Sequence, residues 1–181
     1  MKVLRSLLPG FLGLSVLAAV SVRNVSAADL FSKIRCGTDI PKALIGGMMT
    51  NERTASIEAR HRALGLKDLG GSELKGDLFL ASWLICGNEY LLILDKRSIV
   101  RDVLQFPPHS KDSPEFIGLC RVNGKQLPEE VIAVLNNQAG GDNLSAKSAW
   151  KIDSKTAKFV KLSTEGMLCP RSGIITADGG N

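Results

Sequence analysis

From residue 76 onward, apolar residues come in short runs separated by turn-forming residues, and this spacing constrains the fold more than any other feature. Short apolar runs bounded by Gly, Asn, Asp and Pro are typical of β-strands joined by hairpin-length links. Because no strand–helix–strand alternation is present, the strands should pair antiparallel. About seven or eight strands are expected, in the ranges 78–86, 90–94, 99–106, 116–122, 131–135, 146–152, 158–162 and 167–169.

Two local signals fix where strands turn or stop. Asn123-Gly124 is the strongest hairpin signal in the chain, because both residue types tolerate the positive φ that a two-residue turn requires. Pro107 and Pro108 must end the strand before them, since proline has no backbone N–H to donate to a sheet.

The segment ahead of the strands has helical spacing instead. Asn51 can cap a helix over 51–64, Glu58 and Arg62 are spaced to pair on its surface, and Gly65 is a natural stop. The sequence therefore predicts an α+β, mainly antiparallel β domain. Its N-terminal helices should cover a meander-type sheet or a partly closed barrel.

The first 27 residues have the order of a cleavable secretory signal peptide. Lys2 and Arg5 precede an apolar run over 6–22, and residues 25–27 read Val-Ser-Ala, which suits signal peptidase. The run is shorter than the roughly 20 apolar residues of a membrane span. We therefore expect a secreted or periplasmic product with 28–181 as a single globular domain. The alternative is a chain tethered to the membrane by an uncleaved signal anchor.

The charge of the mature chain is nearly balanced. The whole sequence carries a formal net charge of +5, but removal of Lys2, Arg5 and Arg23 leaves 20 basic and 18 acidic residues, a net charge of +2. Nucleic-acid binding needs a concentrated basic surface, so no nucleic-acid partner is expected. The expected partner is an unknown protein or a component of the cell envelope, without stable membrane insertion after signal cleavage.

The four cysteines all follow the proposed signal peptide. An even number in an exported chain predicts two disulfides. Spacings of 50, 34 and 49 residues lack the close pairs that zinc sites and redox motifs use. Each of the three possible pairings would restrict the unfolded chain by roughly 8 to 9 kcal/mol, so loop length does not choose among them. We favour Cys36 with Cys86 and Cys120 with Cys169, because each bridge then ties segments within one half of the chain.

No motif for a catalytic, cofactor-binding or metal site is present. The chain contains no Gly-x-Ser-x-Gly and no glycine-rich phosphate loop, and its only imidazoles are His61 and His109. His61 lies among charged residues of the expected helix and is interpreted as part of a solvated helix face. His109, Ser110 and Lys111 follow two prolines on a stiffened loop, and such loops often carry recognition, so these three residues form a speculative recognition loop.

Three acids lie at the ends of expected elements, where a catalytic carboxylate would sit. They are Asp39, Glu89 and Asp102. Acids at such positions are ordinarily turn or capping residues, so the sequence alone does not single out a pair.

The function these observations favour is a non-enzymatic exported binding or interaction protein of the cell envelope or extracellular space. One alternative is a small extracytoplasmic hydrolase that uses His109 with a nearby carboxylate such as Asp102. His109 beside a carboxylate and a hydroxyl in a pocket would favour the hydrolase, whereas an exposed His109 without a partner would exclude it. A structural or assembly component of the envelope would instead need a large exposed apolar patch or an unpaired sheet edge.

Overall fold

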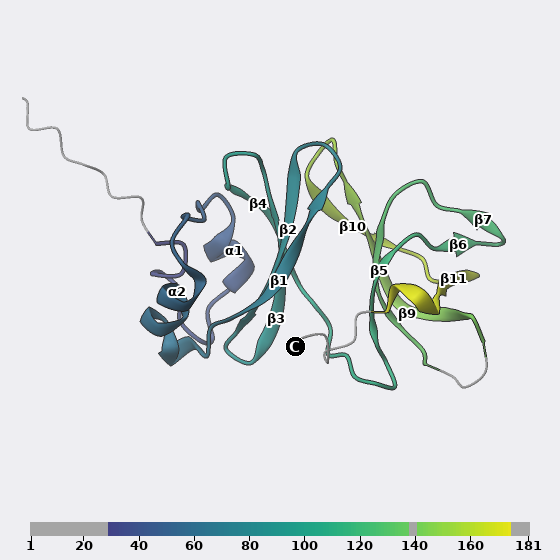
Figure 1. The fold of residues 1–181 in the computed structure, drawn as a ribbon, viewed down its shortest axis with the longest axis horizontal. Coiled ribbons are helices and arrows are strands. Elements are labelled where there is room, and N and C mark those ends of the chain that lie inside the picture. Colours follow the sequence, from purple (N-terminus) through teal and green to yellow (C-terminus); the bar gives the residue numbers. More distant parts are fainter. Residues whose placement is uncertain (1–28, 138–140, 175–181) are drawn as a thin grey trace, which may run out of the picture.

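The computed structural model describes residues 29–137 and 141–174. Within them the chain is mostly antiparallel β-sheet, as the sequence predicts, with few and short helices (Figure 1). The predicted signal peptide, 1–27, lies outside the described residues. In the part that is described, no helix is long and apolar enough to cross a membrane.

The first sheet is an antiparallel meander in which each strand pairs with the next one along the chain. Cys86 and Gly87 form the two-residue link between its second and third strands, and both have positive φ, at 53° and 77°. This backbone geometry suits the right-handed twist of a tight hairpin. The four strands are β1 (Lys67–Leu74), β2 (Leu78–Ile85), β3 (Asn88–Leu94) and β4 (Val100–Gln105).

Strand β1 is not predicted by the sequence. Its eight residues include Gly70 and Gly71, and most of them are exposed, so neither composition nor alternation indicates a strand. It forms because it pairs along its length with the apolar strand β2. Tertiary pairing rather than intrinsic β-propensity therefore sets the conformation of this segment.

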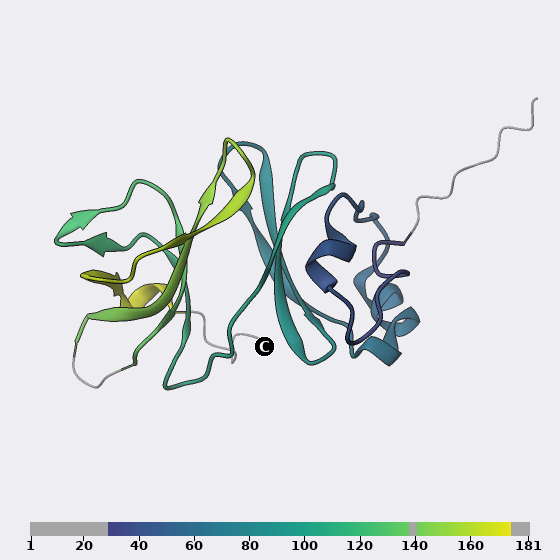
Figure 2. The same cartoon turned by 180° about the vertical axis from the view of Figure 1, so that it is seen from behind.

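The second sheet has the order β5-β8-β9-β11-β6-β7, with β10 paired to β9. The long strand β9 pairs with β11 near Asn143 and with β10 near Asp153, and the sheet curls into a half-barrel (Figure 2). Its strands are β5 (Glu115–Gly118), β6 (Arg121–Val122), β7 (Lys125–Gln126), β8 (Val131–Leu135), β9 (Asn143–Asp153), β10 (Lys158–Leu162) and β11 (Met167–Pro170).

The described residues thus form eleven strands rather than the seven or eight expected. Besides β1, the difference comes from the short strand β7, which is not among the expected ranges, and from the expected strand over 116–122, which is divided into β5 and β6. The division falls beside Cys120, whose disulfide draws this part of the chain toward β11. Asn123 and Gly124 both have positive φ between β6 and β7, so the predicted hairpin is confirmed.

Helical structure within the described residues is limited. The predicted helix over 51–64 is α-helical only in α2 (Thr54–Arg60), and it continues after His61 as the 3-10 helix η1 (Arg62–Leu64). Figure 1 shows α2 and α1 (Ile40–Leu44) on the outer side of the first sheet, away from the second sheet. The remaining helix is the 3-10 helix η2 (Arg171–Gly173).

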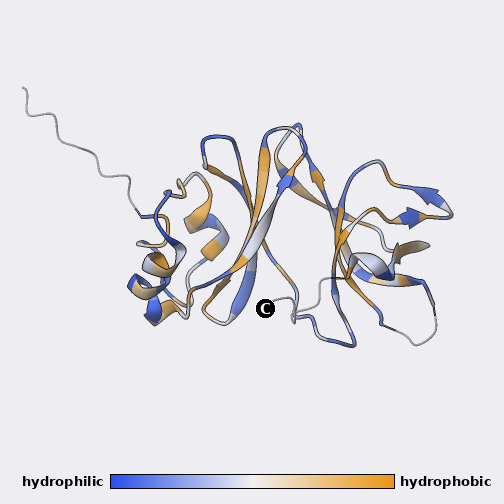
Figure 3. Ribbon diagram, in the orientation of Figure 1, coloured by the Kyte–Doolittle hydropathy of each residue, from blue (hydrophilic) through white to orange (hydrophobic). Residues whose placement is uncertain are grey.

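Buried side chains form three clusters, one on the outer side of the first sheet, one between the sheets and one inside the curl of the second sheet. Figure 3 shows apolar stretches along the first sheet, whereas the β6–β7 hairpin is mainly hydrophilic. The inter-sheet cluster positions the site described below. It contains Leu78, Leu80, Leu91, Ile93, Phe106, Ile132, Val134, Trp150, Ile152 and Ala157.

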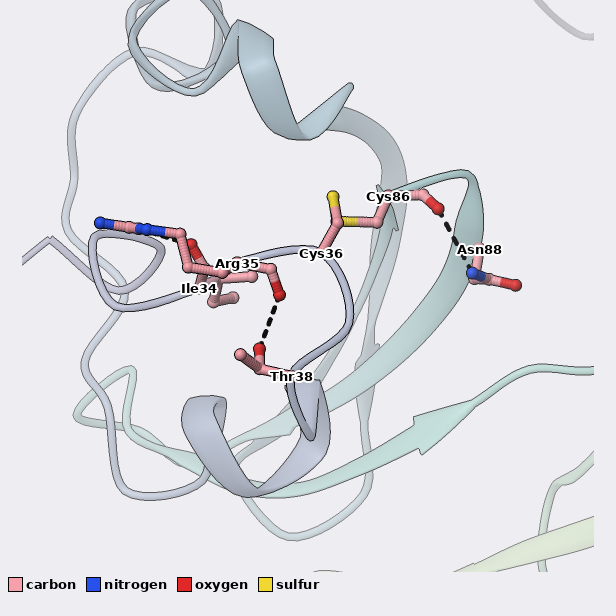
Figure 4. Close-up of a disulfide and its surroundings, with 6 residues drawn as sticks. All are labelled: Ile34, Arg35, Cys36, Thr38, Cys86 and Asn88. Atoms are coloured by element: carbon pink, nitrogen blue, oxygen red, sulfur yellow. Dashed lines mark hydrogen bonds between the residues drawn. A yellow bond between two sulfur atoms is a disulfide. The ribbon is translucent and has the colours of Figure 1, made fainter.

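Two disulfides brace the molecule, in the pairing that the sequence analysis favours. Cys36 bonds to Cys86, which ties the N-terminal segment to the β2–β3 turn (Figure 4). Cys120 bonds to Cys169, which ties the start of β6 to β11 within the second sheet. All four cysteines therefore lie in disulfides, as the sequence predicts.

Candidate functional site

A cleft of about 1400 Å³ lies between the two sheets. The inter-sheet cluster holds the sheets together, and the Asp102 carboxylate of β4 accepts a hydrogen bond of 2.8 Å from the backbone N–H of Phe159 in β10. The sheets separate toward the start of β3, where the cleft opens. Strands β1, β2 and β3 line one wall, and residues 109–117 line much of the other.

The alternation of strand β3 places one acid in this cleft. Leu91 and Ile93 belong to the inter-sheet cluster, whereas Tyr90 and Leu92 belong to the outer cluster. Because side chains alternate across a strand, Glu89 faces the cleft on the same side as Leu91. The apolar floor between the sheets therefore ends at a carboxylate.

The Glu89 carboxylate has two polar neighbours. The Ser82 hydroxyl of β2 donates a short hydrogen bond to Glu89 Oε1, and His109 Nε2 lies 3.6 Å from Glu89 Oε2. The Glu89 side chain is only 10% exposed. It is therefore held in one orientation between a hydroxyl and an imidazole.

His109 reaches the cleft from the loop after β4. Its ring lies 5.5 Å from the Phe106 ring, and Nδ1 lies 3.4 Å from the Pro107 carbonyl oxygen. A proton on Nδ1 would be donated to that carbonyl and would leave Nε2 without a proton, whereas a proton on Nε2 would be donated to the Glu89 carboxylate. The side chain is 33% exposed, so the imidazole is the part of the site most open to solvent.

Glu115, the first residue of β5, supplies a second carboxylate. It faces the same way as Ile117, which packs against the inter-sheet cluster, and the residue is 8% exposed. Its carboxylate makes no hydrogen bond or ion pair within the described chain. The pKa of Glu115 is raised to about 7, chiefly by burial and also by the negative charge of Glu89, while His109 acts in the opposite direction.

Glu89, His109 and Glu115 therefore meet at one point of the cleft, and one potential ligand atom from each lies within 4.8 Å of the others. We call these three residues the carboxylate–histidine centre. Glu115 was not singled out by the sequence analysis, and Glu89 was named only among acids at element ends. The sequence signal that could have indicated Glu115 is its position as an acid directly before the apolar residues of the expected strand over 116–122.

The predicted recognition loop does border the cleft, since Ser110 and Lys111 line it together with His109. The Ser110 hydroxyl accepts a hydrogen bond of 3.2 Å from the backbone of Asp112, and the Lys111 carbonyl accepts one of 2.7 Å from Asn137. The loop is thus fixed by local and tertiary contacts. Its role in recognition remains a prediction.

Two sequence interpretations need correction. Asp102 was considered as the acid partner of His109, but it binds Lys158 and the Phe159 backbone, and the partner of His109 is Glu89. His61 was interpreted as part of a solvated helix face. Instead its Nε2 lies 2.7 Å from an Asp29 carboxylate oxygen, because the N-terminal segment folds back over α2.

Comparisons with protein-family models, with curated proteins and with solved structures each gave no match.

Proposed function

We propose that this chain is an exported, non-enzymatic binding protein that receives a small ligand in the cleft between its two sheets. The observation that carries this proposal is the cleft itself, a cavity with a mixed apolar and polar lining in which two carboxylates and an imidazole converge at one point. The two disulfides support localisation to an oxidising compartment, and the N-terminal sequence supports export.

The lining of the cleft indicates which ligand it would accept. Leu69, Leu80 and Leu91 provide apolar surface on the first sheet, and charged side chains of both signs line the cleft, among them Lys67, Lys111, Asp68, Glu89 and Glu115. An apolar wall favours a ligand with an apolar body, and charged groups favour polar groups on it. We therefore expect a small amphipathic ligand, such as an envelope component would provide.

The test uses two adjacent positions of β1. Ser72 lines the cleft, whereas Glu73 does not, and both are exposed in the strand. Ser72→Trp should narrow the cleft beside Leu80, and Glu73→Trp is the matched control. Native mass spectrometry of protein purified from its own host should find a bound small molecule on the unmodified chain and on Glu73→Trp, and markedly less of it on Ser72→Trp. The absence of any bound molecule, or equal retention by Ser72→Trp, would contradict the proposal.

A second candidate is a hydrolase that uses His109 with Glu89 rather than Asp102. The 3.6 Å approach of His109 to Glu89 inside a cleft favours it. The position of Ser82 opposes it, because the serine hydroxyl bonds to Glu89 and not to the imidazole that would have to activate it. Turnover of ester substrates that His109→Ala abolishes would support the hydrolase over the binding protein.

A further inference from the structure

We propose that Glu89, His109 and Glu115 bind one divalent transition-metal ion in the cleft. This goes beyond the proposed function, because the ion needs only these three side chains and no organic ligand.

The spacing of the three side chains suits a shared ion. Two ligand atoms on a tetrahedral zinc ion, each at about 2.0–2.1 Å from it, are separated by about 3.3 Å. His109 Nε2 and Glu89 Oε2 are already 3.6 Å apart, and all three ligand atoms lie within 4.8 Å of one another. A side-chain movement of up to about 1.5 Å would bring Glu115 into the same coordination sphere.

The burial of Glu115 points to a ligand independently of the spacing. The residue is 8% exposed, its carboxylate is directed at Glu89 and His109, and it has no hydrogen-bond or ion-pair partner in the described chain. Buried charges in proteins are ordinarily paired or coordinate a metal. When both carboxylates are ionised and the imidazole is neutral, the three side chains carry a charge of −2, which a divalent cation would balance.

The donor set indicates the class of ion. Sites for Ca²⁺ and Mg²⁺ are built from oxygen ligands, whereas an imidazole nitrogen beside carboxylates suits first-row transition metals such as Zn²⁺. Three protein ligands leave a coordination position open, and the 33% exposure of His109 provides a path to it.

Neighbouring groups orient two of the ligands. The Ser82 hydroxyl fixes one oxygen of Glu89 and leaves the other directed at His109. The Pro107 carbonyl lies 3.4 Å from Nδ1 of His109, which favours a free Nε2. Metal-binding histidines and carboxylates commonly have such supporting partners, which hold the donor atoms in place.

Calorimetric titration of ZnCl₂ into the tag-free, disulfide-intact protein, after treatment with chelator and dialysis, tests this site. One ion should bind per chain. Glu89→Gln, His109→Ala and Glu115→Gln should each weaken zinc binding at least about tenfold, because each removes one of three donors. Glu129→Gln is the control, since this acid pairs with Lys151 elsewhere and should leave zinc binding unchanged.

Far-UV circular dichroism of every variant shows whether it is folded, and Glu115→Gln is the most conservative of the three because it keeps the size of the side chain. Absence of zinc binding by the unmodified protein would overturn the proposal. So would equal affinity in the folded Glu115→Gln variant, or binding of Ca²⁺ in preference to Zn²⁺. None of these outcomes depends on the ligand tested with Ser72→Trp, so the two proposals can fail separately.

Discussion

The carboxyl group of Glu115 is buried only in the folded protein, so its pKa differs between the folded and the unfolded chain. Burial raises its pKa from 4.5 to about 7, with Glu89 acting in the same direction and His109 against it. The folded state therefore holds this proton more tightly than the unfolded chain does. The stability that results is complete below about pH 4.5 and is lost as the pH rises through 7.

In the presence of chelator, the free energy of unfolding should fall between pH 5 and pH 8 by up to about 3 kcal/mol through this group. Glu115→Gln should remove most of that fall, because the amide does not ionise. Urea denaturation of both proteins across this range measures the difference. An equally steep fall in the variant would show that Glu115 titrates normally.

Of the three residues in the carboxylate–histidine centre, the sequence singled out two and missed the third. His109 stood out because it follows two prolines, and Glu89 because it lies at the end of a run. Glu115 did not, since its burial depends on the pairing of β5 with β8, whose partner residues lie 13 to 19 positions further along the chain. A long-range pairing of this kind has no local signature.

The β1–β2 pair is the element that forms one wall of the cleft. A Cβ atom added at Gly71 would lie 2.2 Å from the Leu80 carbonyl oxygen and 2.8 Å from the Phe79 ring. The carbonyl belongs to the neighbouring strand, so the strand itself would have to shift. Glycine at this position therefore permits the close approach of β1 to β2.

Gly71→Ala should lower the free energy of unfolding by about 1–3 kcal/mol, the usual cost of forcing an extra methyl group into a packed position. The exposed neighbour Ser72 provides the control, and Ser72→Ala should change stability by no more than about 0.5 kcal/mol. Chemical denaturation of both variants measures the effect. Equal stabilities would mean that β1 is free to move away from β2.

Elements with strong local signals were predicted well. The apolar run of residues 131–135 is strand β8, and Asn123-Gly124 forms the expected hairpin. By contrast, β1 has two adjacent glycines and few apolar residues, and it becomes a strand only by pairing with β2. The helix expected over 51–64 shortens to seven α-helical residues because the chain leaves helical geometry at His61.

At the scale of the whole molecule, each sheet has its own disulfide. One bridge ties the N-terminal segment to the first sheet, and the other closes part of the second sheet. Between these braced halves, the apolar inter-sheet cluster gives way to the cleft that holds the carboxylate–histidine centre. The central claim is that the protein binds a divalent metal ion at this centre between the sheets.

Anomalous X-ray diffraction at the zinc edge, from crystals of the disulfide-intact protein grown with Zn²⁺, tests that claim most directly. The account predicts one strong peak about 2.0–2.2 Å from donor atoms of Glu89, His109 and Glu115. Zinc peaks found only at other positions, with these three side chains unliganded, would contradict it.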